Sequence, residues 1–259
     1  MQTGDWVTGQ VKLSIGGEPL EMQMTVPAKP VKPQRMLPIF QQMANSFTEM
    51  GETAVKNAGA KISCKKGCGA CCRQPVPVAE IEAHQLAELV ENMPEPRRSI
   101  VKQRFADAYR HFQSIGWFER LENCAEQKEL ERTVLRYFYE GVPCPFLENE
   151  SCSIHEARPL ACREYLVTTP AKNCSKPSAK KVRLIPLPVK AAATLRHVGQ
   201  TKQRGKINFV PLVLALEWVE RNPDDFLEKT GEQWMADFFR YLTKSEIPQE
   251  NGGAKRAVL

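Results

Sequence analysis

The chain has 259 residues, of which 42% are hydrophobic and 25% are charged, and its formal net charge is +6 at pH 7. This length can bury one large hydrophobic core or two small ones. No stretch approaches the roughly 18 uncharged apolar residues that a membrane-spanning helix requires, so we expect no membrane partner. The first residues also have neither the basic segment nor the apolar run of a secretory signal, and we therefore expect a cytoplasmic protein.

The N-terminal residues predict a β-hairpin. Apolar and polar residues alternate on both sides of Gly16-Gly17, which is typical of two half-buried strands joined at or near a Gly-Gly turn. The alternating apolar positions are Val11, Leu13, Ile15, Leu20, Met22, Met24 and Val26. Prolines at 27, 30 and 33 then predict a stiff linker into the rest of the chain.

The remaining regular structure is predicted to be helical. Apolar residues at helical spacing predict helices near 38–50, 78–93, 97–115, 117–140, 211–221 and 232–242. We therefore expect a mainly α fold with irregular cysteine-rich loops and a small N-terminal β-hairpin element, α+β overall. The expected division is a hairpin extension and proline linker at 1–35, a cysteine-cluster metal-binding domain at 36–176, a helical extension at 177–243 and a disordered tail at 244–259.

The nine cysteines form two groups and one isolated residue. The first group lies at 64–72 and reads Cys-Lys-Lys-Gly-Cys-Gly-Ala-Cys-Cys; the second lies at 144–174 and includes His155. In a reducing cytosol, clustered cysteines are more often metal ligands or redox-active thiols than structural disulfides, and an odd number fits paired disulfides poorly. We interpret the two groups as one metal-binding unit, with redox-active dithiols and disulfides as alternatives.

The spacing of the first group indicates how its thiols converge. Cys64 and Cys68 are four residues apart and Cys68 and Cys71 are three apart, so a turned segment places all three on one face. Cys72 follows Cys71 directly, and neighbouring side chains diverge. Cys72 therefore serves a second metal or a polynuclear cluster, or it packs as an inert thiol. The second group is too widely spaced for one helical face, so we expect its loops to fold over the first group.

The cysteine pattern resembles the YkgJ-type cysteine-cluster family, a zinc- or iron-chelating domain. The motifs that carry the resemblance are Cys-x3-Cys-x2-Cys-Cys, then Cys-Pro-Phe-Leu, Cys-x-Ile-His and Arg-Pro-x2-Cys-Arg, within residues 63–174. The resemblance implies metal binding by eight cysteines and no established reaction. These are Cys64, Cys68, Cys71, Cys72, Cys144, Cys152, Cys162 and Cys174. Soft thiolates suit zinc, iron and iron–sulfur clusters alike, so the choice of metal stays open.

Residues near the cysteines have supporting roles in this hypothesis. Arg158 and Arg163 are placed to hydrogen-bond sulfurs or carbonyls, and Pro159 restricts Arg158 to an extended conformation. His155 is a candidate ninth ligand, but eight cysteines already fill two tetrahedral sites, so we expect it to support a ligand or to pack. Cys124 lies in a predicted helix, outside both groups, and is expected to be a lone thiol.

An iron–sulfur-dependent oxidoreductase or modifying enzyme is one alternative function. Cys-x3-Cys-x2-Cys also occurs in radical S-adenosylmethionine enzymes, but these require a β/α barrel after the motif, and this sequence predicts helices and loops there. No phosphate-binding glycine loop, Gly-x-Ser-x-Gly or His-Glu-x2-His motif is present. The catalytic residues are thus unknown, and whether the protein is an enzyme is undecided, with a non-enzyme favoured.

A zinc-stabilised nucleic-acid-binding protein is the other alternative. Residues 165–216 contain ten Lys or Arg and no Asp or Glu, which would suit a polyanion. Aromatic residues for base stacking are nearly absent there, and the apolar residues at 182–189 predict a buried strand or loop. We therefore expect a solvated basic face that packs on the acid-rich region 119–150, with nucleic acid disfavoured as a partner. The metal ion is the expected partner, and no protein partner is indicated.

Overall fold

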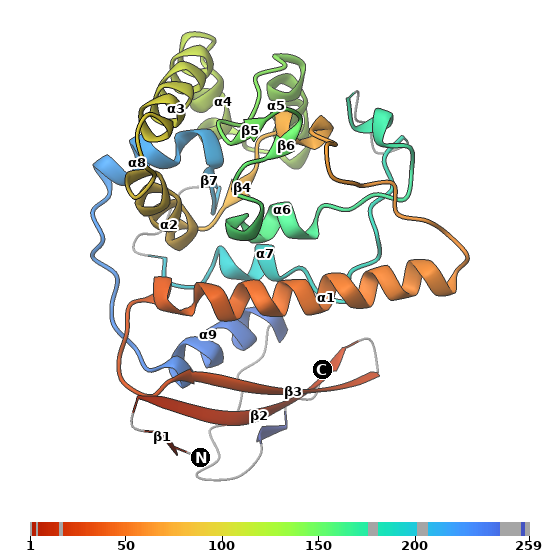
Figure 1. Cartoon of the computed structure of the whole chain (residues 1–259), viewed down its shortest axis with the longest axis vertical. Coiled ribbons are helices and arrows are strands. Elements are labelled where there is room, and N and C mark those ends of the chain that lie inside the picture. The colour runs from red at the N-terminus through yellow and green to blue at the C-terminus, as the bar shows by residue number, and fades with distance from the viewer. Residues whose placement is uncertain are drawn as a thin grey trace.

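The computed structural model of the chain (Figure 1) describes residues 2–3, 5–15, 18–175, 181–200, 207–243 and 255–256. Its α-helices are α1 (Leu37–Asn57), α2 (Glu80–Glu91), α3 (Arg97–Ser114), α4 (Trp117–Asn123), α5 (Gln127–Tyr139), α6 (Leu160–Glu164), α7 (Ala191–Leu195), α8 (Ala215–Arg221) and α9 (Gly231–Thr243). Its strands are β1 (Gln2–Thr3), β2 (Trp6–Ile15), β3 (Glu18–Pro27), β4 (Pro77–Val78), β5 (Leu147–Glu148), β6 (Ser151–Cys152), β7 (Val210–Pro211) and β8 (Lys255–Arg256). Short 3-10 helices are η1 (Pro33–Met36), η2 (Ala70–Arg73), η3 (His155–Ala157), η4 (Ala171–Ser175) and η5 (Leu212–Leu214). The predicted mainly α fold with a small N-terminal hairpin is confirmed.

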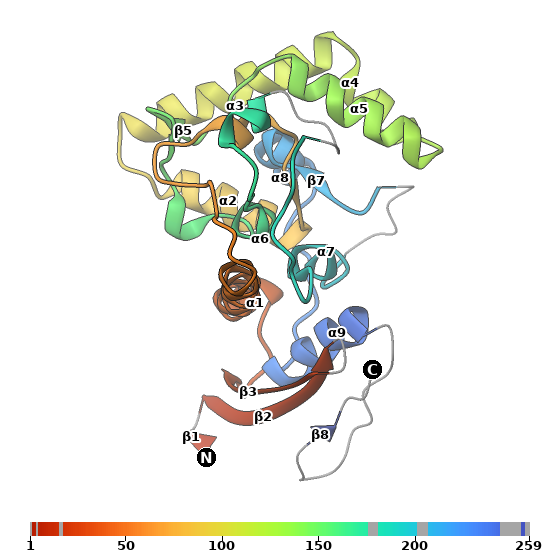
Figure 2. The same ribbon diagram turned by 90° about the vertical axis from the view of Figure 1, so that its right-hand side faces the viewer.

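The elements stack along the long axis of the molecule. The β2–β3 hairpin and α9 lie at one end, α1 crosses the middle, and α3, α4 and α5 lie at the other end (Figures 1 and 2). The helices α2, α6, α7 and α8 fill the space between α1 and that far end. In the described ranges, no helix combines the length and the apolarity that crossing a membrane would take.

The N-terminal hairpin has the predicted alternation. Val7 pairs opposite Val26 and Leu13 opposite Leu20, and Leu13 and Val26 are buried against the first core cluster. Because successive residues of a strand face opposite sides, one face of the hairpin covers the core and the other faces solvent. The expected turn at Gly16-Gly17 lies outside the described residues.

The C-terminal tail was expected to be disordered over 244–259. Only Lys255–Arg256 is described in this range, and these two residues form β8, which pairs in parallel with Val11 and Lys12 of β2. The expected disorder of the tail stays a prediction, because the rest of this range lies outside the described residues. The edge of β2 accepts β8 because an unpaired strand edge offers donors and acceptors to any chain beside it.

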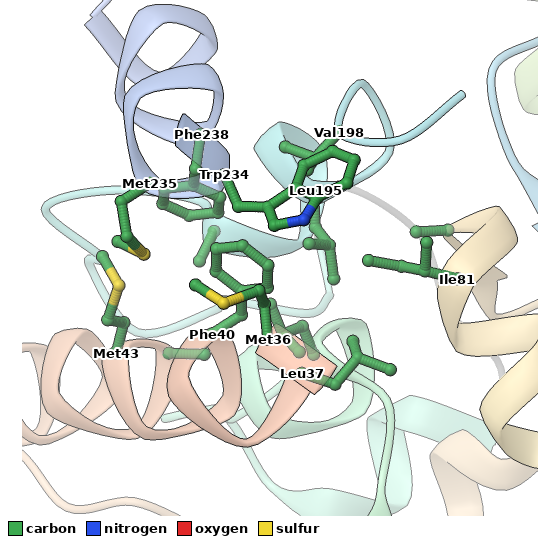
Figure 3. Packing of buried hydrophobic residues seen from close by; sticks show 14 of the residues in the cluster. Met36, Leu37, Phe40, Met43, Ile81, Leu195, Val198, Trp234, Met235 and Phe238 are labelled. Carbon is green, nitrogen blue, oxygen red and sulfur yellow. The ribbon is translucent and has the colours of Figure 1, made fainter. Parts of the chain in front are cut away.

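The first core cluster joins the hairpin to α1, α7 and α9. Figure 3 shows how its residues from α1, α7 and α9 point toward one another. Phe40 of α1 stacks on Phe238 of α9 with ring centroids 4.9 Å apart, and the Trp234 indole N–H donates to the Val31 carbonyl at 2.9 Å. The stripe of Met and Phe residues on α1 is thus core, as its helical spacing predicts. This cluster takes residues from both chain ends, and the expected domain boundaries stay predictions.

The second core cluster fixes the chain directly after the first cysteine group. Pro77 and Val78 of β4 pair with Pro211 and Val210 of β7, and the Leu212 N–H donates to the carbonyl at residue 76 at 2.9 Å. Val78 and Val210 are fully buried. The helix expected at 211–221 begins as η5 and continues as α8. This pairing anchors one end of the cysteine segment in the core.

The prediction of a single helix at 117–140 is wrong, because the helix is interrupted after α4 and a second helix, α5, follows. The Glu129 carboxylate accepts a hydrogen bond from the Ala125 N–H at 2.8 Å, which stabilises the start of α5. The interruption lets α5 fold back on α4. The Trp117 indole N–H then donates to the Thr133 carbonyl at 2.8 Å, and the Tyr137 ring stacks on the Phe112 ring with centroids 3.9 Å apart. The free energy gained by burying these aromatic rings exceeds the cost of interrupting the helix.

The basic region 165–216 is partly folded into the core, as its apolar residues predict. Val167 and Leu184 form an isolated antiparallel bridge, and Ile185 is buried. The expected packing of this region on the acidic stretch 119–150 finds no support among the described ion pairs. Glu148 of the acidic stretch, for example, pairs with Arg97 and Arg104 of α3 and not with the basic region.

Candidate metal centre

The first cysteine segment is tied at its start to a distant part of the chain. The Ser63 N–H donates to the Val167 carbonyl at 2.9 Å, and the Val167 N–H donates to the Cys64 Sγ at 3.4 Å. Val167 is fully buried. The position of Cys64 is therefore set by a short backbone pairing with the segment that follows α6.

The middle of this segment turns sharply. The Cys68 N–H donates to the Lys65 carbonyl at 3.1 Å, and Gly67 has a φ of 82° in the left-handed region that favours glycine. The segment then enters η2, where the Cys72 N–H donates to the Gly69 carbonyl at 3.0 Å. The η2 turn carries Cys71 and Cys72, and Cys68 lies in the turn just before it.

Gly69 is required by a close approach of the second segment. A Cβ atom at Gly69 would lie 2.5 Å from Glu150 Oε2 and 2.8 Å from Leu147 Cδ1. Arg73 holds this contact closed, because its guanidinium donates to the Gly69 carbonyl at 3.0 Å and to Glu150 Oε1 at 2.7 Å. A side chain at position 69 would have to displace the Glu150 carboxylate that Arg73 holds and the Leu147 side chain, and it would press on the Glu150 Cα at 3.2 Å.

The second segment meets the first at Cys144, as predicted. The Cys144 N–H donates to the Cys72 carbonyl at 2.7 Å, and the Cys144 carbonyl accepts from the Leu147 N–H at 2.8 Å. Leu147 pairs with Cys152 across the short β5–β6 hairpin. Two cysteine groups separated by about 70 residues of sequence are therefore joined through their backbones.

Cys162 is placed by α6, and α6 begins on a buried carboxylate. The Leu160 N–H donates to Glu82 Oε1 at 2.7 Å, and the Cys162 N–H donates to the Pro159 carbonyl at 3.0 Å. Glu82 is 1% exposed and also accepts from the Ala79 N–H at 2.8 Å. One carboxylate thus joins the starts of α2 and α6.

The arginines near the cysteines bind carbonyls, as predicted. Arg163 is buried and donates to the Arg158 carbonyl at 2.8 Å, to Asn45 Oδ1 at 3.1 Å and to the Glu156 carbonyl. Arg158 donates to the His155 carbonyl at 3.0 Å. These bonds fix the turn between Cys152 and Cys162, while the His155 side chain is exposed beside Glu156 at 3.5 Å. The geometry thus gives no support to His155 as a ninth ligand.

The thiols lie close enough to influence one another, with Cys71 at the centre. At Cys71 a hydrogen bond with Cys72 is the largest cause of a raised pKa, followed by burial. Burial, with the Cys71 charge as a smaller cause, raises the pKa of five further thiols. These are Cys64, Cys144, Cys152, Cys162 and Cys174, with pKa values of about 12 at Cys144 and about 11 at Cys174. Arg158 partly offsets the rise in pKa at Cys152.

The donor set fits zinc or iron in its chemistry. All nine cysteines are free, which gives no support to the disulfide alternative. Across the described part of the chain, no three Cys, His, Asp or Glu side chains are positioned to hold a metal ion. Metals bind thiolates, so metal binding has to release the thiol protons. It also has to bring the sulfur atoms closer to one another than they are in this structure. Cys124 lies apart, and its thiol donates to the Arg120 carbonyl at 3.1 Å.

Sequence reasoning missed two residues of this region. Glu82 stands at the third position of α2, where a glutamate reaching back to the helix start is a recognisable signal. Its bond to Leu160, 78 residues away, has no sequence signal. Tyr165 lies beside the thiols, since burial and then the charges of Cys174, Cys71 and Cys64 raise its pKa to about 12. Its nearness to Cys162 in sequence is the only available hint.

Residues 63–181 match the CxxCxxCC family, described as a putative zinc- or iron-chelating domain. This match confirms the YkgJ-type resemblance of the cysteine motifs over these residues. The match includes both cysteine groups and supports the binding of zinc or iron by this part of the chain. No curated protein and no solved structure matches the chain.

Proposed function

We propose that this protein chelates zinc or iron through eight thiolates, those of Cys64, Cys68, Cys71, Cys72, Cys144, Cys152, Cys162 and Cys174. The observation that carries the proposal is the 2.7 Å hydrogen bond from the Cys144 N–H to the Cys72 carbonyl, because it joins the two cysteine groups. We further propose that the protein acts in the cytoplasm, where thiols stay reduced and available to a metal.

The surroundings of the thiols support this role. Thiolates gathered on a metal carry a net negative charge, and a cation beside them reduces the repulsion. Arg158 supplies such a charge near Cys152. Backbone pairings at Val167 and at Cys72 hold the loops together from outside the thiol cluster. The bound metal would add a cross-link between the two segments.

The first test is metal content. Protein purified without oxygen should hold at least one tightly bound zinc or iron per chain by elemental analysis, and a visible spectrum separates colourless zinc from an absorbing iron–sulfur cluster. Removal by a chelator should lower the melting temperature and expose hydrophobic surface, because thiolate–metal bonds contribute to folding. An intact fold with no metal would contradict the proposal.

The second test asks whether Cys72 is a ligand. Cys72→Ser removes a thiol next to the central Cys71 and should lower the metal content of the purified protein. Cys124→Ser is the matched control, because Cys124 is buried among Arg120 and Thr133 away from both groups. If both variants keep the metal content of the parent, Cys72 is not a ligand.

A further inference from the structure

Three of the eight thiols pack against the second core cluster, and we call them the inner triad. They are Cys144, Cys152 and Cys162. The β5–β6 hairpin sets Cys152, and the loop from Cys144 leads directly into this hairpin. Burial is the largest cause of the raised pKa of Cys162, and the charges of Cys144, Cys152 and Cys71 are the next causes. The members of the inner triad therefore share one side of the second core cluster.

Three other thiols, Cys64, Cys68 and Cys174, form a second group that we call the outer triad. Val167 binds the Cys64 Sγ and lies on the segment that leads to Cys174. The η4 turn, which carries Cys174, packs against η2. Besides burial, the charges of Cys71, Cys64 and Cys68 raise the pKa of Cys174. The outer triad combines two thiols from the first segment with the last thiol of the second.

The adjacent pair Cys71 and Cys72 lies between the two triads. Cys71 is an electrostatic neighbour of members of both, and the Cys72 carbonyl accepts the Cys144 N–H at 2.7 Å. Neighbouring side chains in a 3-10 turn point roughly 120° apart. In this structure the two thiols are hydrogen-bonded to each other, so metal binding has to replace this bond before one thiol of the pair turns toward each triad.

We infer that the domain holds two metal centres, one at each triad, and that Cys71 and Cys72 each complete one set of four thiolates. This inference rests on the proposed function, because it concerns the same eight thiols. Four thiolates suit a tetrahedral zinc ion and a cubane iron–sulfur cluster equally. A single zinc ion or a single cluster would leave one triad without metal.

Paired variants test the inference. Cys152→Ser/Cys162→Ser removes two inner thiols, and Cys64→Ser/Cys68→Ser removes two outer thiols. After purification without oxygen, each double variant should retain half of the parent's metal, while Cys124→Ser retains all of it. Loss of all metal from either double variant, or of none, overturns the two-centre inference. A parent protein without metal would instead contradict the proposed function.

A measurement on the unaltered protein keeps the test decisive if a variant fails to fold. Stepwise removal of metal by a chromophoric chelator should show two classes of equal size, because the inner triad packs against the second core cluster and the outer triad joins the loop before η2 to η4. Circular dichroism recorded during the titration follows the fold. A parent that holds a single zinc ion or a single cluster, released in one class, would overturn the inference.

Discussion

The buried carboxylate of Glu82 connects the core to the cysteine loops, and its removal has a calculable cost. Glu82 accepts hydrogen bonds from the Ala79 N–H at 2.8 Å and from the Leu160 N–H at 2.7 Å. Leu160 begins α6, which carries Cys162. Replacing Glu82 by alanine therefore leaves two buried amide donors unpaired and releases the start of α6 from α2.

The size of the effect follows from the two bonds. A buried donor left without a partner costs about 1–3 kcal/mol, so Glu82→Ala should lower the free energy of unfolding by about 2–6 kcal/mol. Glu82→Gln keeps an acceptor oxygen for one amide and presents an NH2 group to the other, so it should cost about half as much. Domains of ordinary stability unfold with about 5–15 kcal/mol, so the alanine variant loses a large share.

Urea unfolding of metal-free protein measures this cost directly. Glu88→Ala is the control, because Glu88 lies on the same helix and is exposed. The expected order of stability is the parent, then Glu88→Ala within about 0.5 kcal/mol, then Glu82→Gln, then Glu82→Ala. The reasoning is refuted if Glu82→Ala is as stable as Glu88→Ala.

Three further substitutions test separate contacts. Gly69→Ala should lower both the melting temperature and the metal content, since its Cβ would lie 2.5 Å from Glu150 Oε2; Gly9→Ala, whose Cβ meets nothing within 4 Å, is the control. Trp117→Phe removes the 2.8 Å bond to the Thr133 carbonyl and should cost about 1–3 kcal/mol in urea unfolding; an unchanged midpoint would contradict this. Burial lowers the pKa of His84 below 6.5, so the folded state disfavours its protonation and stability should fall as the pH drops below 6.5. His84→Phe should reduce that fall between about pH 7.5 and 5.5, and an identical fall in the variant would exclude His84 as its source.

The regular elements could be predicted because their signals are local. The hairpin alternates at period two, and α1 and α9 repeat apolar residues at helical spacing, so each pattern records which face is buried. The break between α4 and α5 has only a weak signal, because Asn123 and Cys124 are poor helix formers but no glycine or proline interrupts the run. It exists because Trp117 reaches Thr133 and Tyr137 stacks on Phe112, contacts that only the folded chain brings together.

The metal-binding chemistry could also be predicted, because it is carried by residue type and number. Eight clustered cysteines indicate a soft metal whatever the fold around them. The supporting contacts could not be predicted. Arg163 reaches Asn45, 118 residues away, and Glu82 reaches Leu160 across the core. A sequence pattern identifies donors and acceptors but does not pair them over such distances.

The grouping of the thiols shows the same limit at the site itself. In the sequence, four cysteines lie at 64–72 and four at 144–174, which suggests one group per segment. The fold regroups them, because the pairing of Ser63 with Val167 brings the end of the second segment beside the start of the first. Cys174 thereby joins Cys64 and Cys68, while the β5–β6 hairpin and α6 gather the inner triad on the core. The sequence sets how many thiols are available, and in the arrangement that we propose the backbone pairings decide which of them share a metal.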